Sequence, residues 1–354
     1  MTQEERTQKR PLRQRLDDGA VICAEGYLFE LERRGYLQAG AFVPEVVLEH
    51  PEVVAQLHRE FLRAGTDVVE AFTYYAHREK LRLIGKEDLL EPMQRAALRI
   101  AHEAAGEAEG ELPLVAGNIC NTNVYAPDDP EAQRAVRHMF DEQVAWAAEA
   151  RVDFVIAETI AFHGEAELAL ASIRDAGLEA VVTLAVHREG LRDQVPLEES
   201  CRRLEQNGAL VVGLNCARGP RTMGPLLPGI RQAVSCHVGA LPVPYRTTDD
   251  QPTMQSLRDP ACDCLPGDRP FPTALDPFVC NRYEMAVFAL EALEKNVRYL
   301  GVCCGGAPHH VRAMAEALGR HPPASQYTPD MSKHYALGSD KSLKEHNRAF
   351  VKQL

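Results

Sequence analysis

Three of the ten cysteines lie where two apolar segments end, and together they could hold a metal ion. Cys216 ends the segment Val-Val-Gly-Leu-Asn-Cys, while Cys303 and Cys304 end the segment Tyr-Leu-Gly-Val-Cys-Cys. Three thiolates that leave one coordination position open are typical of catalytic zinc, and zinc lowers the pKa of a further bound thiol. Free cysteine is also among the most often buried residue types, so three inert core thiols are the alternative interpretation.

Cys303 and Cys304 are adjacent, and in a regular strand their side chains would point in opposite directions. The chain therefore has to turn at this pair, which Gly305 and Gly306 permit. A disulfide within the pair would be strained. We expect five of the other cysteines to be core residues: Cys23, Cys120, Cys201, Cys236 and Cys280. Cys262 and Cys264, in a long loop, could form a second metal site, but two further ligands are lacking nearby.

Alternating apolar and amphipathic segments predict the elements that position these cysteines. The apolar segments are rich in Val, Ile, Leu and Ala on both faces, as parallel strands buried on both sides are. They span residues 21–27, 67–72, 112–118, 153–159, 179–186, 209–216, 234–241 and 297–304. Helical periodicity follows each one, at 51–63, 87–105, 130–150, 165–176, 197–207, 221–233, 284–295 and 309–318. Eight such units predict an α/β fold, a (β/α)8 TIM barrel whose carboxyl-terminal strand ends converge on one face.

Three regions depart from this alternation. Residues 1–16 are predicted to be a charged N-terminal tail, and residues 17–320 the catalytic barrel. Residues 242–277, after the seventh strand, contain eight prolines and are predicted to form a long loop on the active-site side. The polar residues 321–354 are predicted to be a C-terminal extension that wraps the barrel or contacts another subunit.

Composition bounds the partners and the compartment. The net charge of -12 disfavours nucleic acid and anionic membranes as partners. The N-terminus has no signal-peptide pattern, and the longest apolar runs, about eight residues, are too short for a membrane span. We therefore expect a cytoplasmic protein with reduced thiols.

Longer motifs then identify a family. The sequences Gly-Leu-Asn-Cys216 and Gly-Val-Cys303-Cys304-Gly, with long stretches at 32–36, 49–52, 57–65 and 308–316, resemble the homocysteine S-methyltransferase family. The resemblance extends from about residue 31 to 324 and is closest to the betaine-dependent branch. It implies the barrel, a Zn²⁺ ion held by the three cysteines, and methyl transfer to the thiol of homocysteine to give methionine. It implies no catalytic side chain beyond the thiolate activation by zinc.

The resemblance places the homocysteine-binding glutamate at Glu158, and the site is expected to include Glu25, Gly26 and Asn215. A carboxylate at a strand end can pair with the ammonium group of an amino acid. Where the family has Asp-Gly-Gly, however, this chain has Ala24-Glu25-Gly26, and an offset of one residue reverses the direction of a side chain in a strand. Two further departures are Thr159 in place of a tyrosine and Leu241 in place of a glutamine.

The resemblance also implies an aromatic cage for the methyl donor, built from Phe42, Tyr74 and Tyr75. Aromatic faces attract onium cations, which cannot donate hydrogen bonds. Phe72 is predicted to be a core residue instead. Phe42 replaces a tryptophan of the betaine enzymes, so the cage is smaller.

The predicted donor is a betaine-like quaternary ammonium. The alternatives are a sulfonium donor (S-methylmethionine or dimethylsulfoniopropionate) or a non-catalytic barrel that binds a thiol or a metal. A homo-oligomer is expected, and its subunit number is left open.

Overall fold

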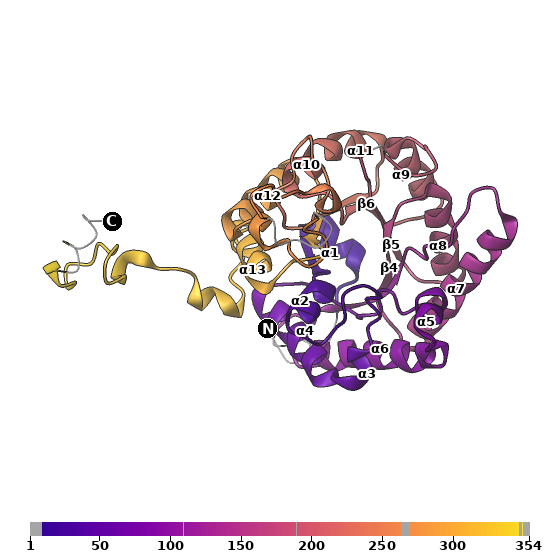
Figure 1. The fold of residues 1–354 in the computed structure, drawn as a ribbon, viewed down its shortest axis with the longest axis horizontal. Coiled ribbons are helices and arrows are strands. Elements are labelled where there is room, and N and C mark those ends of the chain that lie inside the picture. The colour runs from indigo at the N-terminus through magenta and orange to yellow at the C-terminus, as the bar shows by residue number, and fades with distance from the viewer. Residues whose placement is uncertain (1–8, 109, 189, 263–268, 347–348, 350–354) are drawn as a thin grey trace.

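The computed structural model describes residues 9–108, 110–188, 190–262, 269–346 and 349. Eight parallel strands close into a barrel in sequence order (Figure 1). They are β1 (Val21–Ala24), β2 (Val68–Glu70), β3 (Leu114–Cys120), β4 (Phe154–Ile160), β5 (Ala180–Leu184), β6 (Val211–Asn215), β7 (His237–Leu241) and β8 (Tyr299–Val302). The ring closes where β1 pairs with β8, from Val21 opposite Tyr299 to Ala24 opposite Val302. The predicted TIM barrel is confirmed.

Helices surround the barrel, and their apolar faces pack on the strands. In the described residues they are α1 (Leu12–Asp18), α2 (Tyr27–Arg33), α3 (Val46–Glu49), α4 (Pro51–Ala64), α5 (Arg78–Ile84), α6 (Leu90–Gly106), α7 (Pro130–Glu149), α8 (His163–Asp175), α9 (Leu197–Gln206), α10 (Pro220–Met223), α11 (Leu227–Ala233), α12 (Arg282–Glu294) and α13 (Pro308–Ala317). The helix α4 shows why they form. Pro51 begins it, Leu57 and Phe61 are buried at helical spacing, and Gly65 ends it in the left-handed conformation with φ 108°.

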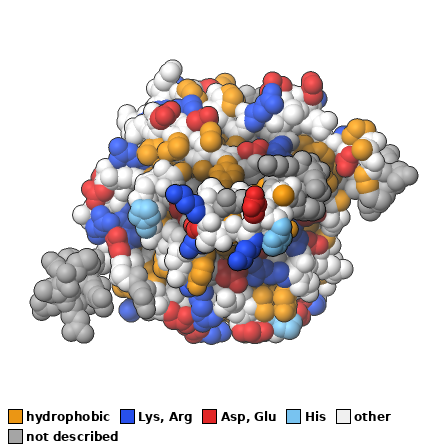
Figure 2. All heavy atoms as spheres, turned by 90° about the vertical axis from the view of Figure 1, so that its left-hand side faces the viewer, with side chains coloured by type: hydrophobic (Ala, Val, Ile, Leu, Met, Phe, Trp, Pro, Cys, Tyr) orange, Lys and Arg blue, Asp and Glu red, His pale blue; other side chains and the backbone are white. Residues whose placement is uncertain are grey.

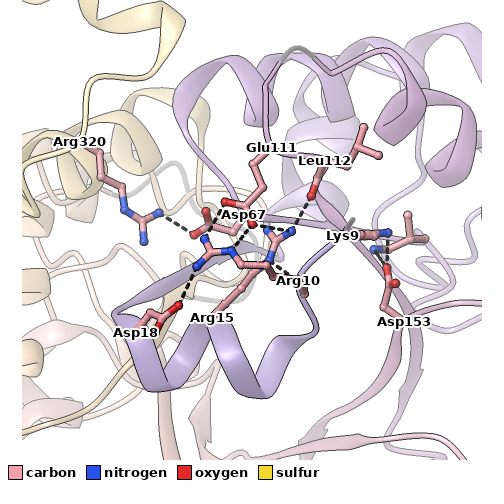
Figure 3. A network of polar contacts seen from close by, with 10 residues as sticks. Lys9, Arg10, Arg15, Asp18, Asp67, Glu111, Leu112, Asp153 and Arg320 are labelled. Atoms are coloured by element: carbon pink, nitrogen blue, oxygen red, sulfur yellow. Dashed lines mark hydrogen bonds and ion pairs between the residues drawn. The ribbon is translucent and has the colours of Figure 1, made fainter. Parts of the chain in front are cut away.

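Helix α1 corrects the prediction that residues 1–16 form only a charged tail. Leu12 and Leu16 of α1 are buried and join a cluster of strand residues from the barrel interior, so the helix closes the end of the barrel where the strands begin. The charged residues around it are paired (Figure 3). Arg10 contacts Glu111 and Asp18. The spacing of only two apolar residues in seven hid this helix from the sequence.

The same end of the barrel joins segments that are distant in sequence. Arg320 contacts Asp67 through a 2.6 Å ion pair, and Lys9 pairs with Asp153 (Figure 3). These ion pairs hold together the segments at the end of the barrel where the strands begin. The opposite face, where the strands end, is left for the polar residues described below.

After β7 the chain forms the predicted long loop, of which residues 263–268, including Cys264, lie outside the described residues. A short 3-10 helix, η3 (Met254–Ser256), lies at the mouth of the barrel. Short turns η6 (Pro323–Tyr327) and η7 (Met331–Lys333) follow α13, and this segment extends away from the barrel (Figure 1). On the face from which it leaves, acidic and basic side chains are interspersed (Figure 2). None of the helices formed by the described residues has the length and apolarity that a membrane crossing requires.

Candidate active site and metal centre

The three predicted metal ligands follow directly after two strands. Cys216 comes after β6, and Cys303 and Cys304 come after β8. The end of β7 holds both turns, because Cys216 N–H donates to the Leu241 carbonyl at 3.0 Å and Cys303 N–H to the Pro242 carbonyl at 3.0 Å. Cys216 has a left-handed backbone, with φ 56°. Such strain in a residue that is not glycine is often found at functional sites.

The three sulfur atoms fit a metal ion. They lie within 4.8 Å of one another, and Cys216 Sγ is 3.8 Å from Cys304 Sγ. Tetrahedral zinc with bonds of its usual length separates sulfur ligands by about 3.8 Å. Hydrogen bonds from the neighbouring thiols of Cys303 and Cys304 lower the pKa of Cys216, although burial opposes this. The cluster thus stabilises a thiolate, which is the form that binds zinc.

Close backbone contact explains the glycines around the cysteine pair. A Cβ atom on Gly26 would lie 2.1 Å from the Gly306 carbonyl oxygen. A Cβ atom on Gly305, whose φ is +86°, would lie 2.2 Å from the Tyr245 hydroxyl. Gly26 therefore lets the loop after β1 approach the cysteine turn.

An inner pocket lies beside Cys303 and Cys304 and contains the carboxylates predicted to bind homocysteine. Asn215 is fully buried and lies between them. Its Nδ2 donates to Glu158 Oε2 at 2.7 Å, to Glu25 Oε2 at 3.2 Å and to Thr159 Oγ1 at 2.9 Å. Glu25 thus reaches the pocket despite its offset of one position, because β1 ends at Ala24 and the strand alternation stops there.

Two residues of this pocket were missed by sequence reasoning. Asn118 of β3 donates from Nδ2 to Glu158 Oε1 at 2.7 Å and to Glu70 Oε1 of β2. The buried atoms Glu25 Oε1 and Asn118 Oδ1 have no hydrogen-bond partner among the described residues. A signal was present, because both Glu70 and Asn118 are polar residues near the ends of otherwise apolar strands.

The inner pocket therefore contains more hydrogen-bond acceptors than donors. Burial, and after it the charge of Glu158, raises the pKa of Glu25 and Glu70 well above the ordinary range. Burial raises the pKa of Glu158 to about 7. Of the described residues that line the pocket, none is Lys, Arg or His. A group with several N–H donors and a positive charge would satisfy these acceptors.

An outer cavity of about 340 Å³ is lined by Cys216 and Cys304. The three predicted cage residues, Phe42, Tyr74 and Tyr75, all line it. The rings of Tyr74 and Tyr75 are 4.3 Å apart and inclined by 48°. Cys120 Sγ accepts a 3.3 Å hydrogen bond from Tyr75 N–H, which helps to hold the left-handed backbone of Tyr75.

Sequence reasoning missed another part of the wall of this cavity. Arg192 lies there with its guanidinium carbon 4.7 Å from the centre of the Phe162 ring. Glu165 is buried and accepts hydrogen bonds from the Thr122 backbone N–H at 2.8 Å and hydroxyl at 2.6 Å. Arg192 and Phe162 lie in segments between elements, where no periodicity marks them.

The remaining predicted departures have clear places. Leu241 is fully buried in the barrel interior, and it contributes to the site through its carbonyl, which accepts the hydrogen bond from Cys216 N–H. Thr159 lines the outer cavity at an irregular position in β4, and its N–H donates to Asn215 Oδ1 at 2.8 Å. Phe72 is a core residue, as predicted. The five cysteines predicted as core are buried apart from Cys236, which is partly exposed.

Comparisons with known proteins identify the family of the chain. The homocysteine S-methyltransferase family model matches residues 22–318. S-methylmethionine–homocysteine S-methyltransferase of Rattus norvegicus is 36% identical, over 97% of this chain and 90% of its own length. Betaine–homocysteine S-methyltransferase 1 of Xenopus tropicalis is 36% identical, over 97% of this chain and 83% of its own length. The metallated homocysteine methyltransferase MmuM from Escherichia coli shares the fold with a TM-score of 0.67 and 19% identity, over 87% of this chain and 99% of that chain.

Proposed function

Because the chain belongs to the homocysteine S-methyltransferase family and is thus an S-methyltransferase, we propose that it moves a methyl group from an onium donor to the sulfur of homocysteine, with zinc as its metal. One observation carries this proposal. The three clustered thiols border two spaces: Cys303 and Cys304 line a pocket rich in acceptors, and Cys216 and Cys304 line a cavity that also contains aromatic rings. An aminothiol and an onium cation are the two ligands that match these two sides.

Cys216, Cys303 and Cys304 would hold the metal. Bound zinc would keep the thiol of the acceptor as a thiolate near neutral pH. On the inner side, Glu158 and Glu25 would receive the ammonium of homocysteine, and Asn215 would hold both carboxylates in position.

On the outer side, Phe42, Tyr74 and Tyr75 would surround the onium group and aim one methyl at the sulfur. The sulfur electron pair forms the new S–CH3 bond, while the electrons of the broken bond leave with a neutral amine or sulfide. No general acid is required, because the leaving group departs uncharged. The protein contributes alignment of the reactants and exclusion of water from two opposite charges.

The predicted donor is a quaternary ammonium such as betaine, and a sulfonium donor is the alternative. Relatives named for betaine and for S-methylmethionine are equally similar to this chain, at 36% identity. Phe42 stands where the betaine enzymes are expected to have a tryptophan, and the smaller cage supports keeping the sulfonium class in the proposal.

Metal analysis and a donor panel test the proposal. Purified protein should contain about one zinc per chain, and Cys304→Ala should lose most of it. Zinc-loaded protein should convert homocysteine to methionine with at least one of betaine, S-methylmethionine and dimethylsulfoniopropionate. Zinc that is absent from the wild type, or unchanged in Cys304→Ala, would contradict the metal site. Bound zinc without transfer from any donor would favour the non-catalytic barrel instead.

We also propose that the C-terminal extension, residues 321–354, takes part in forming a homo-oligomer. Its described part leaves the barrel and exposes Tyr327, Met331, Tyr335 and Leu337. A chain that ends at residue 320 should sediment as a smaller species than the full chain. Identical assembly of the two would contradict this role.

A further inference from the structure

The outer cavity contains one strong cation that the proposed transfer does not use. Arg192 is the only Lys or Arg among the described residues that line this cavity. Its guanidinium makes no ion pair or hydrogen bond with another described residue, although most arginines of the barrel surface are paired with carboxylates. A guanidinium without an acceptor, beside a ligand cavity, is available to bind an anionic group of the ligand.

The segment that carries Arg192 is held in place. Arg192 N–H donates to the Ala161 carbonyl at 2.8 Å. Arg218 holds the start of the segment through the carbonyls of Val186, at 3.0 Å, and His187, at 2.8 Å. The Phe162 ring lies against the guanidinium at 4.7 Å. The cation is therefore positioned before any ligand arrives, which reduces the entropy lost on binding.

The same cavity connects Arg192 to the reacting centre. Its walls include the cage residues Tyr74 and Tyr75 together with Cys216 and Cys304. Its volume, about 340 Å³, suits a small molecule that contacts both the cage residues and Arg192. Glu165 is the only carboxylate among the described lining residues, and its Oε1 already accepts two hydrogen bonds from Thr122. The Arg192 guanidinium thus offers its N–H donors to a ligand.

We propose that Arg192 is the residue that binds the carboxylate of the methyl donor. This inference rests on the proposed function and names the residue that recognises the anionic end of the donor in the outer cavity. A planar guanidinium recognises a carboxylate through two parallel N–H···O bonds, which a carboxamide cannot accept in the same way. Arg192 is then a residue that determines donor specificity and takes no part in bond breaking.

Matched donor pairs test this assignment. Betaine is compared with betaine amide, and S-methylmethionine with its amide, because each pair differs only in the carboxylate. In the wild type, kcat/KM should be about 10- to 100-fold higher for the acid of the accepted pair. Arg192→Leu should remove most of this preference, mainly by raising KM for the acid. Arg192→Lys should retain part of it, because lysine keeps the charge and loses the fork.

Arg188→Leu is the matched control, because Arg188 is an exposed arginine of the same segment that does not line the cavity. It should leave the acid preference unchanged. Equal kcat/KM for acid and amide in the wild type would overturn the assignment, and so would an equal loss for both donors in Arg192→Leu. If no donor is turned over, the proposed function fails separately. Calorimetric binding of the same pairs to zinc-loaded protein then still decides whether Arg192 selects the acid.

Discussion

Replacing Glu70 by Gln should stabilise the protein and weaken homocysteine binding at the same time. Glu70 is buried beside Glu158 and shares Asn118 with it. Gln has the same shape, can still accept from Asn118, and removes one negative charge from a pocket without a cationic side chain among its described residues. Relief of a buried, uncompensated charge should raise the free energy of unfolding by about 1–3 kcal/mol at pH 8.

The pH dependence gives the sign of this effect. The pKa of Glu70 is raised in the folded state by burial and by the charge of Glu158. The carboxyl therefore disfavours folding once the pH exceeds its unfolded value of about 4.3, and the penalty grows until the folded pKa is reached. The advantage of Glu70→Gln should thus vanish near pH 4 and be largest at pH 8, as measured by urea unfolding.

Homocysteine binding should change in the opposite direction. An ammonium in the inner pocket would exchange one charge-assisted hydrogen bond for a neutral one, a loss of about 1–1.5 kcal/mol, or about tenfold in Kd. Calorimetry with zinc-loaded protein measures this, and 4-sulfanylbutanoate, which lacks the amine, should show no such loss. The control Glu142→Gln changes a carboxylate that is paired with Arg78 outside the pocket and should show neither effect. A less stable Glu70→Gln variant, or an unchanged Kd, would refute the reasoning.

Three further predictions concern separate features. Burial lowers the pKa of His58 to about 3, so the free energy of unfolding should fall as the pH drops below about 6.5. By pH 5, urea unfolding should show a loss about 2 kcal/mol larger in the wild type than in His58→Gln. Equal losses in the two proteins would contradict this. Gly26→Ala places a Cβ atom 2.1 Å from the Gly306 oxygen and should lower the free energy of unfolding, measured by thermal unfolding, by about 3 kcal/mol or more. The control Gly19→Ala, which has free space around it, should leave stability unchanged. An unchanged stability in Gly26→Ala would argue against the close approach. Phe42→Leu should raise KM for the onium donor about two- to fivefold in steady-state assays without changing KM for homocysteine, and an unchanged donor KM would remove Phe42 from the cage.

The sequence predicted the barrel and the cysteine cluster because both depend on local patterns. Buried parallel strands are continuous apolar runs, and residues at their carboxyl ends converge whatever the details of packing. The inner pocket was only half predicted. Glu70 and Asn118 meet Glu158 because neighbouring strands have a particular register, with Glu70 opposite Ala116 and Asn118 opposite Ile156. Register is a property of the closed ring, which no single segment encodes.

Neither the part of the outer cavity around Arg192 nor helix α1 could be predicted from the sequence, and the reasons differ from those for the inner pocket. Arg192 lies in an irregular segment whose path is fixed by hydrogen bonds from distant residues such as Arg218. Helix α1 is short, and its two buried leucines have meaning only against the end of the barrel that they cover. In both cases the determining contacts come from parts of the chain that are far away in sequence.

The inner pocket and the outer cavity share lining residues, and this has a kinetic consequence. Apart from the partly exposed Tyr74, the residues that line the inner pocket are buried, and α1 covers the opposite end of the barrel. Tyr74 and Cys304 belong to the walls of both pockets. We therefore expect a molecule bound in the outer cavity to block the way from the solvent to the inner pocket. We expect the two substrates to bind in a compulsory order, acceptor before donor. Excess donor should then inhibit by occupying the passage first, and the demethylated donor should leave before the methylated thiol.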